Sequence, residues 1–315
     1  MWGVTVLQLR ALETLHALGA LDRRGDLTKQ GRTMADFPLD PQYSLMLLRS
    51  VEFGCSEEAI TMVAMLSAEN IFTMSNVNRA EAEAAHKQFA HVCGDHLTLL
   101  QVWRMHENVR TGNRGQGGVA AWCRTNSIND RSMKKAADVR KQLRLMCERK
   151  SIPLVSCGDE LDSVRKCLAA GLFLNCAVRG DGGTYVTLMD HQEVSIHPSS
   201  VLKNVAKKPS HLIFSEVRAS FLILCTSSVL RFYRRQTANR LRPNFWQLVL
   251  TTKQYLRDVT AIEASWLLEF SPHYFRKRKD PKNRSSSAGF RVASSSSSAV
   301  DRSMWGRAGA MKQLP

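Results

Sequence analysis

The hydrophobic pattern of the chain changes near residue 151, and this change predicts the fold class. Before residue 151, apolar residues recur at steps of three and four, the period of helices that bury one side. After it, short apolar runs rich in β-branched residues alternate with glycine-rich turns, which is typical of a small β-barrel. We therefore predict a multidomain protein that is mainly α and then β.

Residues 1–54 contain the signals of three short helices. Leucines recur every third residue from Leu9 to Leu18, and Gly19 follows as a helix end. Thr28 suits the N-cap of a second helix, and Asp40 followed by Pro41 suits the start of a third. With the tight turn at residues 22–25, this predicts a winged-helix-like domain over residues 1–54. A plain helical bundle fits the same pattern.

Residues 55–150 are predicted to form a helical bundle. Acidic residues open its first helix, residues 79–110 also look helical, and residues 127–149 form a long helix. That last helix has an apolar stripe made of Met133, Ala136, Val139, Leu143 and Met146. Its segment 131–150 carries eight basic and two acidic residues. The spacing fits a solvated charged face and a contact with RNA equally well.

Residues 151–270 are predicted to form the barrel. Extended segments are expected at 152–155, 185–188, 194–197 and 248–251, with a helix over 164–174 and a hairpin turn at 180–183. The acidic run 159–162 is expected to be the start of that helix. Residues 271–315 are rich in Ser, Arg and Gly and have little to bury, so we predict a disordered basic tail.

The net charge of +16 is a weaker argument for nucleic acid than it seems. The segment 217–247 holds six arginines and no acid, and residues 271–315 carry a net charge of +8. These two segments account for 14 of the 16 charges, so the rest of the chain is close to neutral.

The sequence lacks the motifs of several functional classes. The sequence contains no Gly-Lys pair, so it has no phosphate-binding loop of the common nucleotide-binding type. The eight cysteines and the histidines lack the spacing of a metal site, and we expect neither metal nor catalytic residues. A signal peptide and an apolar run of eighteen residues are also lacking, so no membrane partner is expected. The basic run 276–279 suits nuclear import, and we predict a nuclear protein.

Several motifs resemble the C-terminal region of DEAH-box RNA helicases, in the family's order. Residues 18–22, 27–32 and 34–41 resemble the winged helix that follows the second RecA domain. Residues 94–100 and 132–143 resemble the helicase-associated or ratchet domain, and residues 196–200 and 249–257 resemble the OB-fold. The spliceosomal and ribosome-biogenesis branch of the family is the most similar.

This resemblance implies a function in RNA remodelling such as pre-mRNA splicing. The implied partners are single-stranded RNA, a G-patch activator protein, and a spliceosome or ribosome-biogenesis complex. The full-length members of the family bind ATP and Mg²⁺, but we expect no cofactor in this chain. The predicted RNA-binding residues are Arg131, Lys134, Lys135, Arg140 and Lys141 on the long helix and His197, Ser199, Ser200, Thr251, Thr252 and Lys253 at strand ends. For the hydroxyl residues, ordinary turn capping is the alternative.

Departures from the family limit these expectations. The ATPase core is absent, so we expect the chain not to hydrolyse ATP alone. An in-frame phosphate-loop motif in the genomic sequence upstream of Met1 would mark a truncated gene product. The family pattern runs directly from Glu216 to Leu248, and in this chain residues 217–247 stand between them. We predict that this segment is a retained intron, which transcript sequencing would test. We also predict that it interrupts the strand pairing of the barrel. The chain would then be an RNA-contacting region or a protein-interaction platform. A winged-helix DNA-binding regulator is disfavoured, because Arg49 is the only basic residue in helix 41–53.

Overall fold

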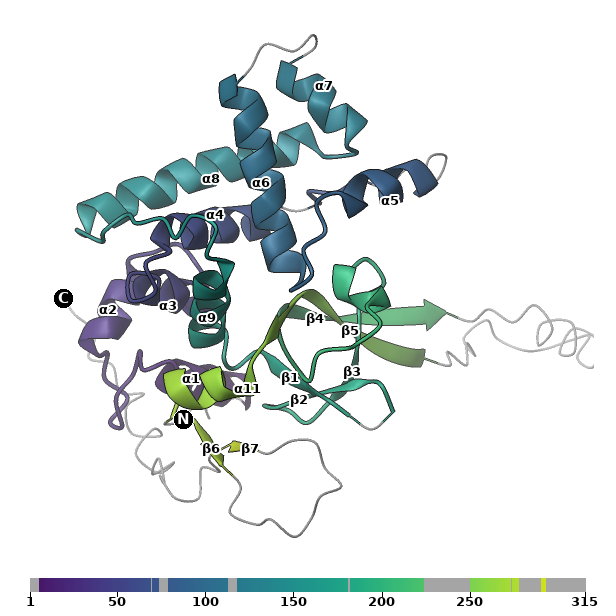
Figure 1. Cartoon of the computed structure of the whole chain (residues 1–315). Helices are drawn as coiled ribbons and strands as arrows, with labels where there is room; N and C mark the ends of the chain where they lie inside the picture. The colour runs from purple at the N-terminus through teal and green to yellow at the C-terminus, as the bar shows by residue number, and fades with distance from the viewer. Residues whose placement is uncertain are drawn as a thin grey trace, which may run out of the picture.

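A computed structural model describes residues 6–68, 70–73, 79–112, 118–180, 182–223, 250–272, 274–277 and 290–292. The helices lie together on one side and the barrel on the other, and helix α6 runs from the barrel toward helix α8 (Figure 1). None of the described helices is both long and apolar enough to span a membrane.

The first three helices form where the sequence predicts them. They are α1 (Val6–Ala17), α2 (Lys29–Ala35) and α3 (Pro41–Arg49). Thr28 caps α2, because its Oγ1 accepts a hydrogen bond of 2.9 Å from the Gly31 backbone N–H. A Cβ on Gly31 would lie 2.1 Å from the backbone oxygen of Ala20, so only glycine allows this approach. Asp40 occupies the N-cap position of α3 but makes no capping bond with its side chain.

The helical bundle comprises α4 (Ser56–Ser67), α5 (Arg79–Lys87), α6 (Asp95–Gly112), α7 (Gly118–Thr125) and α8 (Asp130–Arg149). The predicted stripe of α8 is confirmed, since Met133, Ala136 and Leu143 are buried. The helical pattern predicted over residues 79–110 breaks between α5 and α6. The break follows from Gly94, whose φ of +137° lies in a region that L residues rarely adopt.

Helix α9 (Leu161–Gly171) joins the bundle to the barrel. As predicted, the acidic run 159–162 leads into its first turn. A Cβ on Gly171 would lie 2.5 Å from the Cβ of Met46, so the two helices α9 and α3 pack closely. The extended segment before α9 has no strand partner in the described residues; instead, Pro153 O accepts a hydrogen bond of 2.7 Å from Ser56 Oγ.

The barrel closes in the strand order β1-β2-β3-β5-β4. Its strands are β1 (Cys176–Arg179), β2 (Tyr185–Thr187), β3 (Glu193–Ile196), β4 (His211–Ile223) and β5 (Leu250–Ile262), and the 3₁₀ helix η1 (Val201–Asn204) lies between β3 and β4. Strand β3 pairs with β5 in parallel, and the other neighbours are antiparallel. The predicted hairpin is confirmed, because β1 pairs with β2 and the Gly180 N–H donates a hydrogen bond of 2.9 Å to Thr184 O; residue 181 itself lies outside the described residues.

The prediction that residues 217–247 interrupt the barrel pairing is wrong. Residues 217–223 lengthen β4, and they pair with residues 250–256 in the same register that joins Phe214 to Val259. Of the predicted strand 248–251, Leu250 and Thr251 lie in β5, and the remainder falls outside the described residues. The retained intron stays a prediction.

The described end of the chain packs onto the helices. Helix α11 (Ala264–Phe270) follows β5, and β6 (Phe275–Lys277) pairs with β7 (Phe290–Val292). Phe275 is buried and contacts Phe173 ring to ring at 6.3 Å. The largest core cluster therefore runs from Leu18 of the first domain to Phe275. The prediction that residues 271–315 are disordered is wrong for this part of the tail, because Phe275–Lys277 and Phe290–Val292 form paired strands and Phe275 is buried in the core. Residues 278–289 and 293–315 lie outside the described residues, where disorder stays a prediction.

Candidate nucleic-acid interface

A buried polar joint fixes helix α6 on the barrel. His96 lies fully buried between two strands, with Nδ1 2.8 Å from Thr260 Oγ1 and Nε2 3.0 Å from Ser215 Oγ. A Cβ on Gly94 would lie 2.3 Å from the backbone oxygen of Val259, so glycine is required there. Burial lowers the pKa of His96 to about 3, which keeps the ring neutral.

Two carboxyl groups belong to the same joint. Asp95 accepts hydrogen bonds of 2.9 Å from the backbone N–H groups of Val201 and Val259. Burial raises the pKa of Asp95. Burial, together with the nearby Asp95, raises the pKa of Asp258 to about 6. Asp258 also has a φ of +50°, so the backbone of β5 is distorted at this point.

Basic and aromatic side chains share one face of the barrel strands. Lys253, Tyr255 and Arg257 alternate along β5, while Leu256 between them is fully buried. Arg218 of β4 lies directly opposite Tyr255. We call Arg218, Lys253, Tyr255 and Arg257, together with the neighbouring Glu216 and His197, the outer barrel face.

Glu216 holds the two arginines of the outer barrel face side by side. Its Oε1 accepts a hydrogen bond of 2.7 Å from Arg218 Nε and one of 3.4 Å from Arg257 Nη1. The Arg218 side chain is 59% exposed, and the Arg257 side chain is 28% exposed. Both guanidinium groups therefore remain accessible to a ligand in solution.

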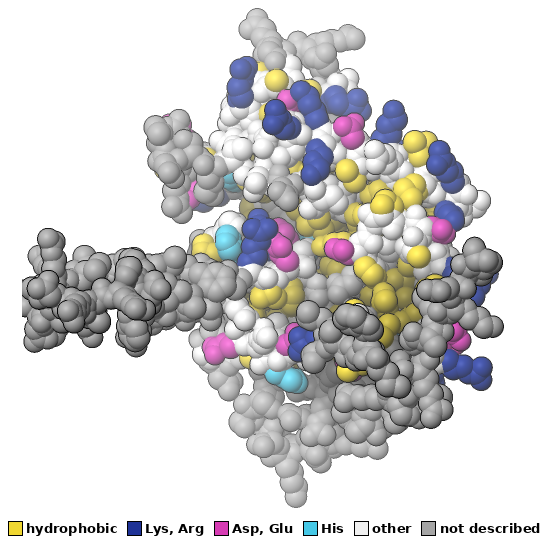
Figure 2. Space-filling view, turned by 180° about the vertical axis from the view of Figure 1, so that it is seen from behind, with side chains coloured by type: hydrophobic (Ala, Val, Ile, Leu, Met, Phe, Trp, Pro, Cys, Tyr) yellow, Lys and Arg dark blue, Asp and Glu magenta, His cyan; other side chains and the backbone are white. Residues whose placement is uncertain are grey.

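His197 borders this face at the end of β3. Its ring centroid lies 5.8 Å from that of Tyr255, at an interplanar angle of 82°. Nδ1 accepts a hydrogen bond of 3.2 Å from the Ser199 backbone N–H, so a neutral ring carries its proton on Nε2. Burial, with Arg257 and Arg218, lowers the pKa of His197. Histidine and basic side chains gather next to acidic ones where the described strands end (Figure 2).

The other predicted residues of the barrel have different surroundings. Ser199 is exposed beside His197. Ser200 is buried, and its Oγ caps η1 by accepting a hydrogen bond of 3.2 Å from the Leu202 backbone N–H, which is the capping alternative. Thr251 and Thr252 lie in β5, and their side chains are outside what the structure describes.

The predicted residues of α8 divide into two groups. Arg131, Lys135 and Lys141 are exposed, and so is Lys134, which forms an ion pair of 2.7 Å with Asp130. Basic side chains are spread over this helical half of the molecule (Figure 2).

Arg140 instead takes part in helix packing. Its guanidinium donates to Glu57 at 2.6 Å and to Thr61 at 2.8 Å, and lies 5.5 Å from the Trp103 ring centroid.

Three domain families match the chain in sequence order. The winged-helix Helicase associated domain (HA2) matches residues 11–39, and the ratchet-like Helicase associated domain (HA2) matches residues 40–99. The Oligonucleotide/oligosaccharide-binding (OB)-fold matches residues 164–274. The first match favours the winged helix over a plain bundle.

Curated relatives agree with these matches. The chain is 36% identical over 271 residues to ATP-dependent RNA helicase DHX33 of Homo sapiens and 35% identical over 271 residues to that of Mus musculus. It is 34% identical over 270 residues to Probable ATP-dependent RNA helicase DHX35 of Pongo abelii. Each alignment covers 85% of this chain and 32–33% of the relative, so the chain spans about a third of their length.

The chain belongs to the DEAH-box RNA helicases. It corresponds to their accessory C-terminal region of winged-helix, ratchet-like and OB-fold domains. The motif at residues 94–100, by which it resembles the ratchet domain, is here the joint between α6 and the barrel.

Sequence reasoning missed four residues of the outer barrel face in this helicase region, which are Glu216, Arg218, Tyr255 and Arg257. Tyr255 and Arg257 belong to a quoted motif, and their i, i+2 spacing from Lys253 was the signal that one strand face carries all three. Arg218 had no such signal, because it lies in the segment that the family pattern lacks.

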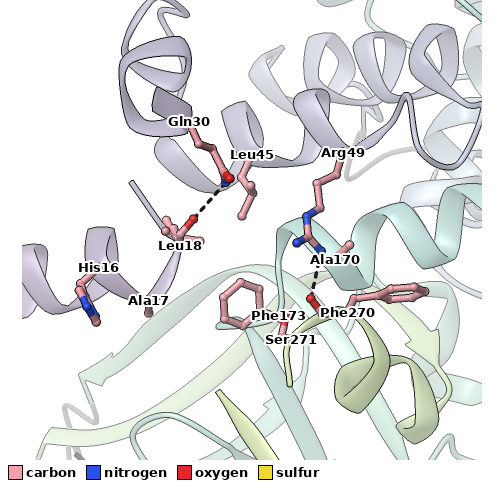
Figure 3. Close-up of a pocket in the computed structure, with 11 residues that line it drawn as sticks. His16, Ala17, Leu18, Gln30, Leu45, Arg49, Ala170, Phe173, Phe270 and Ser271 are labelled. Carbon is pink, nitrogen blue, oxygen red and sulfur yellow. Dashed lines mark hydrogen bonds between the residues drawn. The ribbon is translucent and has the colours of Figure 1, made fainter. Parts of the chain in front are cut away.

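A pocket of about 200 Å³ lies between the winged helix and α11 (Figure 3). Apolar side chains such as Leu18, Leu45 and Phe173 line it together with the polar residues His16 and Gln30. At its edge, Arg49 Nη1 donates a hydrogen bond of 3.0 Å to Phe270 O and thereby ties α3 to α11. The pocket thus lies between the first and the last described domains of the helicase region.

Proposed function

We propose that this chain is an RNA-contacting accessory region of an ATP-dependent helicase and binds single-stranded RNA at the outer barrel face. The observation that carries the proposal is the alternation of Lys253, Tyr255 and Arg257 on a strand next to Arg218 and His197. Cations that follow a phosphate backbone, combined with an aromatic ring for base stacking, suit binding without sequence preference. The RNA-binding family of its relatives supports the same proposal.

The exposed stripe of α8 is the second surface that we propose for RNA. Arg131, Lys135 and Lys141 recur at steps that keep them on one side of a helix. Lys134 adds a charge that Asp130 partly neutralises. We leave Arg140 out of this surface, because Glu57 and Thr61 already bind its guanidinium.

The cellular setting is also part of the proposal. We propose a nuclear function in RNA remodelling such as pre-mRNA splicing, within a spliceosome or ribosome-biogenesis complex. ATP and Mg²⁺ are the cofactors that we propose for a full-length helicase, and we expect the purified chain not to hydrolyse ATP by itself. Robust RNA-stimulated ATP turnover by the purified chain would contradict that expectation.

A protein-interaction platform is the second candidate, favoured by the pocket between the winged helix and α11. Its lining combines apolar side chains with polar ones and has Arg49 at the edge, which suits a side chain of a protein partner that is apolar with a polar end. The partner that we propose for this role is a G-patch activator protein.

Salt-dependent binding separates the two candidates. The test is fluorescence anisotropy of a labelled twelve-nucleotide oligo(U), titrated with the full chain at several salt concentrations. Phosphate contacts predict that the logarithm of affinity falls linearly with the logarithm of salt concentration. Arg257→Ala and Lys253→Ala are each expected to weaken binding and to lower this slope by about one. No measurable binding at low salt would refute the RNA proposal, while G-patch peptide binding that survives high salt would support the platform.

A further inference from the structure

Residues 217–220 occupy the place that residues 248–251 would take without the inserted segment, and residues 221–223 extend the strand further. In a chain without the insert, Glu216 would be followed directly by Leu248. The β4–β5 pairing up to the pair Glu216–Arg257 would then stay as it is. Leu248 would then lie opposite Leu256, where Val217 lies in the present chain. Both residues are aliphatic, so either strand can complete the barrel beside the fully buried Leu256.

The two alternatives differ at the next residue. Val249 would lie opposite Tyr255 in the shortened chain, whereas Arg218 lies there in this chain. Directly opposed residues of antiparallel strands point to the same side of a sheet. The segment 217–223 therefore adds a cation to the outer barrel face without removing a barrel strand.

The position of the added cation beside Arg257 matters for ligand binding. Glu216 binds both guanidinium groups through one carboxylate oxygen, at 2.7 Å and 3.4 Å. The three groups together carry one net positive charge, which a single phosphodiester neutralises. Tyr255, opposite Arg218, offers a ring on which an adjacent base can stack.

We propose that Arg218 and Arg257, bridged by Glu216, form a phosphate-binding arginine pair for single-stranded RNA, and that the inserted segment creates this pair. The inference rests on the proposed function, because it assumes that RNA reaches the outer barrel face. Glu216 has two effects in it. Its carboxylate keeps the guanidinium groups adjacent, and its charge weakens their attraction for phosphate.

The test compares Arg218→Ala with Arg23→Ala in the full chain, using the same oligo(U) anisotropy titration. Both variants lose one exposed arginine, and Arg23 lies in the turn before α2, on a different domain. We expect Arg218→Ala to weaken binding about three- to tenfold and to lower the salt slope by about one. Arg23→Ala is expected to change affinity by less than about twofold. Equal affinities for the two variants would overturn the proposal.

Two further variants test the Glu216 bridge between the two arginines and the replacement of residues 248–251 by the inserted segment in the barrel. Glu216→Gln keeps an oxygen that can accept from a guanidinium but removes the charge, so we expect severalfold tighter binding. This gain should be smaller in the Arg218→Ala background, where only Arg257 remains beside residue 216. Unchanged affinity of Glu216→Gln would contradict the bridge. Deletion of residues 217–247 should leave a cooperative thermal unfolding transition and barrel circular dichroism, and loss of both would contradict the strand replacement.

The outcomes also separate this inference from the proposed function. If the unaltered chain fails to bind oligo(U) at low salt, the proposed function itself fails. If the chain binds and Arg257→Ala weakens binding but Arg218→Ala does not, the function stands and the arginine pair is refuted.

Discussion

Asp258→Asn is expected to stabilise the fold at neutral pH. Burial and the neighbouring Asp95 raise the pKa of Asp258 from 3.8 to about 6. One pKa unit corresponds to about 1.4 kcal/mol, so the charged carboxylate costs the folded state about 3 kcal/mol above pH 7. Asparagine has nearly the same shape, and it tolerates the φ of +50° at this position better than most residues.

The pH dependence has a definite sign. Because the folded pKa lies above the unfolded one, the folded state holds the proton more tightly, and stability falls as pH rises from about 4 to about 6. The gain from Asp258→Asn should therefore be about 2 to 3 kcal/mol at pH 7.5 and about half of that at pH 5.

Urea unfolding measures this effect. Circular dichroism at pH 7.5 and pH 5 gives the free energy of unfolding for both proteins, provided that the m-value is unchanged. The matched control is Asp138→Asn on the exposed side of α8, for which we expect a change within about 0.5 kcal/mol at both pH values. A destabilised Asp258→Asn protein at pH 7.5, or an equal gain at both pH values, would refute this account of the buried joint.

Two further substitutions test the packing of the helices. Gly94→Ala should destabilise the fold by about 3 kcal/mol or more in a thermal unfolding measurement. The added Cβ would lie 2.3 Å from the backbone oxygen of Val259, and the residue would keep a φ of +137°. Gly112→Ala, with open space around its Cβ, is the control in the same measurement. Arg140→Ala should cost about 1 to 3 kcal/mol by leaving Glu57 without its 2.6 Å partner, whereas Lys141→Ala should weaken oligo(U) binding and change the unfolding free energy by less than about 0.5 kcal/mol. The reverse pattern in this pair would contradict the division of α8 into packing and RNA-contacting residues.

Local signals predicted the parts of the fold that depend on neighbouring residues. Three such features are present in the structure: the Thr28 cap, the apolar stripe of α8 and the hairpin of β1 and β2. Each depends on residues within a few positions. The motifs by which the chain resembles DEAH-box helicases extended this to the order of the domains.

The remaining features depend on contacts between distant parts of the chain. The break before α6 arises because Gly94 meets β5, more than 160 residues later. Arg140 resembles its basic neighbours in sequence, and only the position of α4 shows that Glu57 binds it. The lengthened β4 likewise depends on the register with β5, which no local pattern of residues 217–223 reveals.

The outer barrel face as an RNA-binding surface is the central claim, and photo-crosslinking tests it most directly. The full chain is crosslinked to oligo(U) containing 4-thiouridine, digested with trypsin, and analysed by mass spectrometry. Cleavage after Lys253 and Arg257 releases residues 254–257, which include Tyr255. We predict RNA-modified peptides that contain Tyr255, with loss of this modification at high salt. Modification confined to the winged helix, with residues 254–257 unmodified, would contradict the claim.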